Sequence, residues 1–158
     1  MCGINGFIKS GKFVRDSVRS DIEGMNAALS HRGPDGEGVH IDERLPVALG
    51  HRRLSIIDLS DNASQPMTSG SGRYVISFNG EIYNFQSIKE ELDKDDHTIA
   101  WRSTSDTEVL LELIETVGPV AALKRIVGMF AFALLDREEQ KLFLARDRMG
   151  RNPAITGE

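Results

Sequence analysis

The residue with the clearest chemistry in this chain is Cys2, the only cysteine. If Met1 is removed, Cys2 carries both a thiol and a free α-amine, whose ordinary pKa values are about 8.5 and about 7.7–8.0. Because both groups titrate near neutrality, the amine can act as the base that activates the thiol as a nucleophile. The position alone is weak evidence, since a cysteine at the start of a strand more often packs as a small apolar residue. Other residues must support the assignment.

Further short motifs follow Cys2 along the chain. In sequence order the motifs occupy residues 1–6 (MCGING), 31–36 (HRGPDG), 51–58 (HRRLSIID), 65–67 (QPM), 78–84 (FNGEIYN), 105–108 (SDTE), 128–133 (GMFAFA) and 145–148 (ARDR). Together they resemble the glutaminase domain of the class II glutamine amidotransferases, a family with an N-terminal nucleophile. The pattern is most similar to the asparagine synthetase (glutamine-hydrolysing) branch. The motifs keep the family order from the first residue to about Pro153, so the resemblance covers nearly the whole chain.

The resemblance implies a catalytic group formed by Cys2, Asn79 and Gly80. Attack of a thiolate on the glutamine side-chain amide places negative charge on the carbonyl oxygen, and donors aimed at that oxygen usually give the largest catalytic contribution. The family uses an Asn side-chain amide and the backbone N–H of the next Gly, which correspond to Asn79 and Gly80. The alternative interpretation is a tight turn, because Asn-Gly favours two-residue hairpins. The two interpretations are compatible.

The resemblance also implies residues that hold the amino-acid end of glutamine. These are Arg53, Ile56, Ile57, Glu81 and Asp106. A guanidinium matches a carboxylate with two parallel hydrogen bonds, so Arg53 would bind the α-carboxylate and Asp106 the α-ammonium. The simpler alternatives are a surface charge on a strand for Arg53 and a first-turn acid that stabilises a helix dipole for Asp106. We expect the neighbouring Arg52 to be exposed.

The histidines do not form a recognisable metal site. The chain has four histidines without paired spacing and one cysteine, so we expect no metal. His31 and His51 are interpreted as structural residues, and the segment 31–36 is expected to shape the mouth of a pocket.

The elements that must position these residues are both helices and strands. Apolar periodicity and capping patterns predict helices at 15–30, from Ser105 onward and at 120–126, strands at 3–8, 38–41, 47–54, 74–78, 81–85, 129–135 and 141–145, a loop at 61–72, and a hairpin turn at Asn79–Gly80. Strands in adjacent pairs with intervening helices indicate antiparallel sheets covered by helices. The resemblance implies an α+β fold, a four-layer αββα sandwich of the N-terminal-nucleophile hydrolase type.

The length of 158 residues corresponds to one domain. We expect residues 1–153 to form the glutaminase domain and residues 154–158 to be an unmatched end, as in a truncated chain that lacks the last strands of the fold. ATP and Mg would belong to a synthetase domain that this sequence does not contain, so no cofactor is expected on this chain. The implied partners are glutamine and an ammonia-accepting synthetase domain or protein.

Composition narrows the other possibilities. The net charge is −5 with both signs scattered, which disfavours nucleic-acid binding. The apolar runs are too short to cross a membrane, and a lone cysteine fits the reducing cytoplasm. The expected function is hydrolysis of glutamine to glutamate and ammonia, as the ammonia-supplying half of an asparagine synthetase.

Three alternatives stay open. The chain could be an inactive fragment that serves as a binding or regulatory module, or a Cys peptidase or amidase of the same fold. Arg53 and Asp106, which suit a free amino acid, argue against the second. The third alternative is a glucosamine-phosphate or purine-pathway amidotransferase of the same family. These enzymes typically carry a Tyr-Arg-Gly-Tyr-type motif where this chain has His31-Arg32-Gly33-Pro34, which favours the asparagine synthetase branch.

Overall fold

Two antiparallel sheets lie face to face between helices. The computed structural model describes residues 2–42, 44–54, 63–95, 99–152 and 156–157. In chain order the elements are β1 (Gly3–Ile8), α1 (Arg15–Ala28), β2 (Gly36–Ile41), β3 (Val47–Arg53), β4 (Met67–Thr68), β5 (Tyr74–Ile82), α2 (Phe85–Asp95), α3 (Asp106–Val117), α4 (Pro119–Arg125), β6 (Gly128–Asp136) and β7 (Lys141–Arg146).

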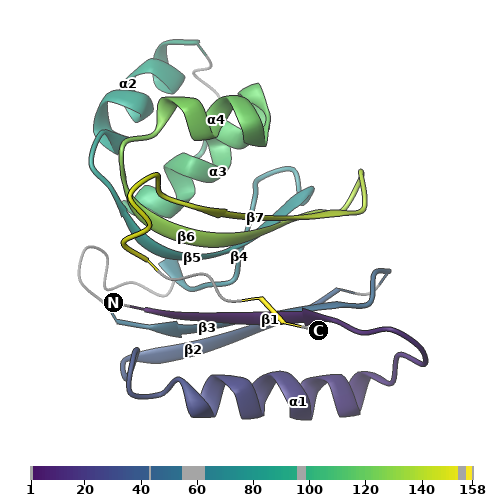
Figure 1. Cartoon of the computed structure of the whole chain (residues 1–158). Helices are drawn as coiled ribbons and strands as arrows, with labels where there is room; N and C mark the ends of the chain where they lie inside the picture. The colour runs from purple at the N-terminus through teal and green to yellow at the C-terminus, as the bar shows by residue number, and fades with distance from the viewer. Residues whose placement is uncertain (1, 43, 55–62, 96–98, 153–155, 158) are drawn as a thin grey trace.

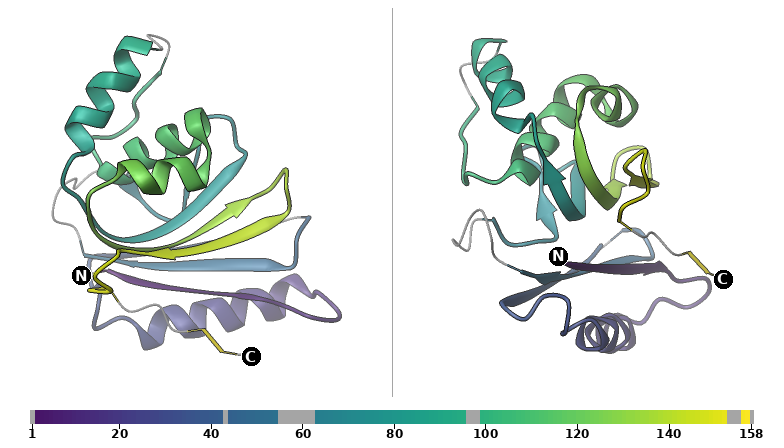
Figure 2. Two further views of the ribbon diagram at one scale, coloured as in Figure 1. Left: turned by 45° about the horizontal axis from the view of Figure 1, so that its top comes forward. Right: turned by 60° about the vertical axis from the view of Figure 1, so that its left-hand side comes forward.

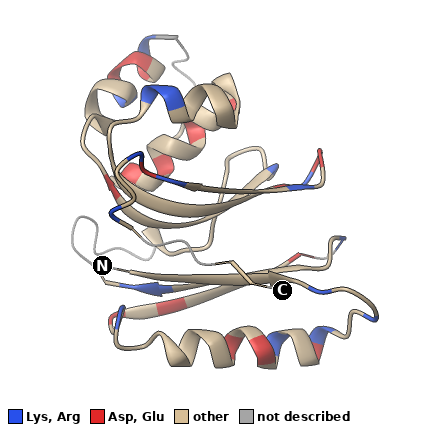
Figure 3. Cartoon of the chain, viewed as in Figure 1, with Lys and Arg blue, Asp and Glu red and all other residues tan. Residues whose placement is uncertain are grey.

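The described strands form one sheet in the order β1-β3-β2 and a second in the order β4-β5-β6-β7. Helix α1 covers the outer face of the first sheet, and α2, α3 and α4 cover the outer face of the second (Figures 1 and 2). This arrangement confirms the α+β, four-layer αββα sandwich. The described helices include none that is long and apolar enough to span a bilayer. Figure 3 shows acidic and basic residues interspersed on α1, with few charges on the strands between the helices.

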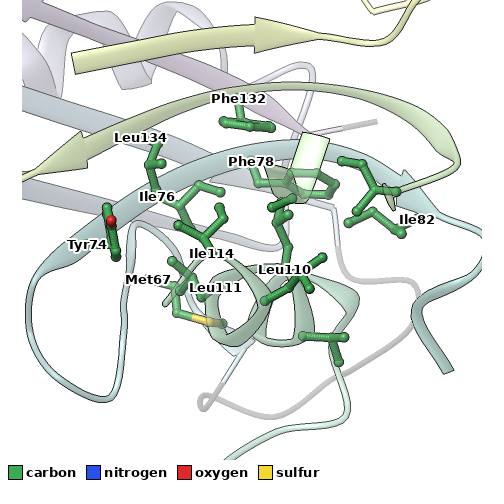
Figure 4. Close-up of a cluster of buried hydrophobic side chains, with 14 of the residues drawn as sticks. Met67, Tyr74, Ile76, Phe78, Ile82, Leu110, Leu111, Ile114, Phe132 and Leu134 are labelled. Atoms are coloured by element: carbon green, nitrogen blue, oxygen red, sulfur yellow. The ribbon is translucent and has the colours of Figure 1, made fainter. Parts of the chain in front are cut away.

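Alternation along the strands explains how each sheet buries two faces. In β5, Ile76 and Phe78 pack against the helices, together with Leu110 and Ile114 of α3 (Figure 4). Val75, which directly precedes Ile76 and so points to the opposite face, packs with Val47 and Leu49 of β3 in a separate cluster between the sheets. On the other face of the first sheet, Val18 and Ile22 of α1 pack on Ala48.

The local patterns predict most elements well. Helix α1 begins at Arg15 as predicted and ends at Ala28. Helix α3 starts after Ser105, whose hydroxyl accepts the backbone N–H of Glu108 at 3.2 Å, so the predicted capping interaction is confirmed. A buried capping residue typically contributes about 1 kcal/mol to helix stability.

The predicted hairpin at Asn79–Gly80 is wrong. Strand β5 runs unbroken from Tyr74 to Ile82, and Asn79 and Gly80 pair with Ala131 and Phe130 of β6. A nine-residue ladder with a distant strand outweighs the local turn preference of an Asn-Gly pair. The predicted strand 81–85 therefore ends at Ile82.

Sequence patterns also missed helix α2, which occupies Phe85–Asp95. Its buried side chains, Ile88 and Leu92, are four residues apart and face the core beside α3. The short strand β4 lies within the segment predicted as a loop, where Met67 and Thr68 pair with β5.

Candidate active site

Cys2 lies directly before β1 and is half-buried. The backbone N–H of Leu54 donates to Sγ of Cys2 at 3.3 Å, and Sγ lies 3.7 Å from the Leu54 carbonyl oxygen. Since β1 and β3 are antiparallel with Gly3 opposite Arg52, the same register places Cys2 opposite Arg53. The structure therefore brings the candidate nucleophile and the candidate carboxylate ligand to one end of the first sheet.

Strand alternation places both residues on the face that meets the second sheet. In β1, Asn5 points to α1, where its amide donates to Asn26 Oδ1 at 2.7 Å, so the even-numbered positions, Cys2 included, face the other way. In β3, Leu49 belongs to the cluster between the sheets, and Arg53 follows it at even spacing. Cys2 and Arg53 thus share the inner face of the first sheet.

Asn79 faces the same inner layer from the second sheet. Ser77, two residues earlier in β5, donates from its hydroxyl to the Gly50 carbonyl oxygen of β3 at 2.9 Å. His51 Nε2 lies 3.1 Å from the Phe78 carbonyl oxygen. Contacts therefore advance along β3 and β5 in the same direction, and the Arg53 end of β3 lies toward Asn79. Asn79 itself is only 5% exposed.

The backbone N–H of Gly80 points to the open edge of β5. On that edge, Gln65 Oε1 accepts the Phe78 N–H at 2.6 Å and Asp106 Oδ2 accepts the Ile82 N–H at 2.9 Å. Backbone N–H groups alternate sides along a strand, so Phe78, Gly80 and Ile82 direct their N–H groups to the same edge. The Gly80 N–H therefore points outward between the two contacts just described. In the described part of the chain, the β4 ladder reaches only Val75 and Ile76. The Gly80 N–H therefore lies outside that ladder.

Gly80 also has a packing reason to lack a side chain. A Cβ at this position would lie 2.3 Å from the Met129 carbonyl oxygen and 2.6 Å from Phe130 Cα on β6. The close approach of the two backbones thus requires glycine independently of any role for its N–H.

Asp106 is buried at the start of α3 beside the end of β5. Burial raises the pKa of its carboxyl group, with a smaller contribution from the charge of Glu81, while the Ile82 and Thr107 N–H groups oppose the shift. A desolvated carboxylate of this kind gains much from a cationic partner. The simpler interpretation, an acid in the first helical turn, also fits its position.

Arg52 is not exposed as expected. Its side chain is only 14% exposed, its Nε donates to the Gly33 carbonyl oxygen at 2.9 Å, and its Nη1 lies 2.7 Å from Glu37 Oε2. The Asp35 N–H donates to the Arg53 carbonyl oxygen at 3.0 Å. The segment 31–36 is therefore fixed against the end of β3 that carries Arg53.

His51 is buried between the sheets, away from the surface. Burial lowers its pKa to about 4, and the nearby charge of Arg53 acts in the same direction, while the contact with the Phe78 carbonyl opposes them. The ring is therefore neutral at pH 7, and its Nε2–H donates to that carbonyl. This environment supports the structural interpretation of His51.

The remaining predicted residues differ in what can be said of them. Glu81 is exposed near the end of β5. Ile56 and Ile57 lie outside the described residues. Within the described residues, no group of three or more His, Cys, Asp or Glu side chains could hold a metal ion.

Sequence reasoning missed one neighbour of the site. Asn152 is fully buried, and its Oδ1 accepts from Asn79 Nδ2 at 3.5 Å. The two residues are 73 positions apart, and no local pattern links them. The only sequence signal near Asn152 was the motif at 145–148, which precedes it in the chain.

Comparison with known proteins identifies the family. Asparagine synthetase [glutamine-hydrolyzing] 2 of Bacillus subtilis is 40% identical over 100% of this chain. Asparagine synthetase B of Escherichia coli K12 is 36% identical over 99% of this chain. The chain spans only 20% and 27% of these two relatives.

A solved glutamine phosphoribosylpyrophosphate amidotransferase from B. subtilis, 22% identical, superposes on 77% of this chain and 33% of its own with a TM-score of 0.62, which supports the fold. The family model described as a glutamine amidotransferase domain matches residues 1–158. The chain therefore belongs to the glutamine amidotransferase domain family.

Proposed function

We propose that this chain hydrolyses glutamine to glutamate and ammonia with Cys2 as the nucleophile. The observation that carries the proposal is the shared location of the candidate residues. Cys2 and Arg53 lie opposite each other on the inner face of one sheet, and Asn79 faces the same layer from the other sheet. An amino acid held there would meet a thiol, a guanidinium and amide donors together.

The reaction runs in two halves. In the first, the free α-amine of Cys2 takes the thiol proton, and Sγ attacks the side-chain carbonyl carbon of glutamine. The negative oxygen that forms accepts hydrogen bonds from the Asn79 amide and the Gly80 N–H. The C–N bond then breaks, the protonated amine returns its proton to the leaving nitrogen, and ammonia departs from a thioester.

In the second half, water attacks the thioester carbonyl and the same amine accepts a water proton. The same two donors stabilise the second negative oxygen. The C–S bond breaks, the thiol regains its proton, and glutamate is released. Atoms and charges balance without a cofactor on this chain.

The ends of the substrate are assigned to Arg53, for the α-carboxylate, and Asp106, for the α-ammonium. Ile56, Ile57 and Glu81 would complete the binding site. The ammonia would pass to a synthetase domain or protein, with asparagine as the product in a complete asparagine synthetase, where ATP and Mg would be required. The lone cysteine supports a cytoplasmic location.

A glutamate-release assay on protein whose N-terminal mass shows loss of Met1 tests this proposal. We expect glutamine-dependent glutamate and ammonia in equal amounts, and loss of both in Cys2→Ala. Protein that retains Met1 should be inactive, because its Cys2 nitrogen lies in a peptide bond. Full activity of Cys2→Ala would contradict the mechanism, and an inactive, Met1-processed chain that still binds glutamine would favour the binding-fragment alternative.

A further inference from the structure

The side chains of Asn152 and Asn79 meet in the buried layer between the sheets. We propose that Asn152 is a positioning residue that fixes the Asn79 amide in the orientation needed to stabilise the negative oxygen. The proposal rests on the proposed function, because it assumes that Asn79 is a donor to that oxygen. Asn152 acts through Asn79 and is not itself assigned to touch the substrate.

The geometry of the pair fits this role. Asn79 Nδ2 donates to Asn152 Oδ1 at 3.5 Å, and the two residues are 5% and 0% exposed. A side-chain amide carries two N–H donors in one plane. When Asn152 accepts one of them, the amide plane is fixed and the second N–H has a defined direction.

Asn152 is itself fixed by Asp147. The two oxygens of this carboxylate accept backbone N–H groups from Arg151 at 3.2 Å, Asn152 at 3.3 Å and Phe130 at 3.2 Å. The Asp147 N–H also donates to the Phe130 carbonyl oxygen at 2.8 Å. The turn that carries Asn152 is therefore tied to one residue of β6.

The same β6 residue lies opposite Gly80. Phe130 pairs with Gly80 in the β5–β6 ladder and anchors the carboxylate that holds Asn152. The two proposed donors, the Asn79 amide and the Gly80 N–H, are thus both positioned relative to Phe130. This shared anchor would hold them in a constant relation to each other, as preorganised catalysis requires.

A structural asparagine can use both ends of its amide. Asn84 does so, since its Nδ2 donates to the Arg125 carbonyl oxygen at 3.0 Å and its Oδ1 accepts the Val127 N–H at 2.9 Å. Asn152 instead has a buried Nδ2 without a hydrogen-bond partner among the described residues. Its one described side-chain hydrogen bond is the contact with Asn79.

A double-mutant cycle tests the proposal. Asn152→Ala and the similarly sized Asn152→Leu both remove the acceptor, and each is made in the natural chain and in Asn79→Ala. The measurements are kcat and KM for glutamine, with thermal unfolding of every variant. Asn84→Ala is the matched control, because it removes a half-buried asparagine whose hydrogen bonds go to Arg125 and Val127 and not to Asn79.

We expect either substitution of Asn152 to lower kcat at least tenfold. The upper bound is the cost of losing one donor completely, which is roughly 10²–10³-fold. KM should change less than about twofold, since the bond to the oxygen forms only in the transition state. In Asn79→Ala the same substitutions should have no further effect. Asn84→Ala should lower the unfolding temperature and leave kcat unchanged.

Two results would overturn the proposal: an unchanged kcat in both folded variants of Asn152, or an equal loss of kcat with and without the Asn79 amide. Failure of the proposed function would look different. In that case the natural chain, confirmed to lack Met1, would release no glutamate, and Cys2→Ala would show no glutamine binding in calorimetry, whatever residue occupies position 152.

Discussion

The backbone N–H of Leu54 donates to Sγ of Cys2 across 3.3 Å, although the two residues are 52 positions apart in the sequence. The contact joins the start of β1 to the residue that follows β3. An N–H donor aimed at sulfur is oriented to stabilise negative charge on it. Because Leu54 directly follows Arg53, the same stretch of backbone would position the nucleophile relative to the residue proposed to bind the substrate carboxylate.

Arg53→Ala should weaken glutamine binding without comparable loss of stability. A charge-assisted hydrogen-bonded contact contributes about 1.5–3 kcal/mol, so KM should rise roughly 10–150-fold. Steady-state kinetics measure this change. Arg52→Ala is the matched control, since the Arg52 guanidinium is bonded to Gly33 and Glu37. Equal increases in KM for the two variants would contradict the assignment of Arg53.

Asp106→Asn should bind glutamine more weakly and unfold at a higher temperature at pH 7. The pKa of Asp106 is raised in the folded chain, mainly by burial, so its ionisation costs folding free energy. The folded state binds more protons than the unfolded state between the ordinary pKa and the raised one, so stability falls as pH rises through that window. The neutral amide removes this cost and can still accept the Ile82 N–H.

Thermal unfolding at pH 3 and pH 7, with calorimetric binding in the Cys2→Ala background, measures both effects of Asp106→Asn. The stability gain should be present at pH 7 and absent at pH 3. A variant that binds glutamine as tightly as the natural chain would leave Asp106 with a structural role only.

Gly80→Ala should damage both stability and catalysis. The new methyl group would lie 2.3 Å from the Met129 carbonyl oxygen, so the β5 backbone must move, at a cost of about 1–3 kcal/mol. Displacement of the N–H should lower kcat roughly 10²-fold or more. Gly24→Ala is the control: its methyl group meets nothing within 4 Å in the middle of α1, so it should stabilise by about 0.5–1 kcal/mol. Unchanged kcat in folded Gly80→Ala would exclude its N–H from the reaction.

Acid should destabilise the chain through His51. Its pKa is about 4 when folded, below its ordinary value of 6.5, so the unfolded state binds more protons between these limits. The contribution of His51 to the free energy of unfolding is therefore complete above pH 6.5. It falls as pH decreases toward 4, by up to about 3 kcal/mol. Chemical denaturation between pH 4 and pH 7 measures the slope. His51→Gln should flatten it, and His31→Gln, at an exposed position, should not.

Local sequence patterns determined most of the elements of this protein. The motif that starts at Ser105 specified the beginning of α3, because a capping hydroxyl and the N–H that it accepts are three residues apart. The apolar spacing of Val18 and Ile22 specified the buried face of α1 in the same way. The resemblance of the ordered motifs specified the family and the layered fold.

Tertiary structure decided what the local patterns could not. It extended β5 through Asn79 and Gly80, because the ladder with β6 outweighs a turn preference that involves two residues. It also revealed Asn152 beside Asn79. Sequence by itself could specify the residue types and the local elements, since these depend on neighbours a few positions away. The distances between Cys2, Arg53, Asn79 and Asn152 depend on how two sheets pack, and that packing is a sum of contacts between residues far apart in the chain.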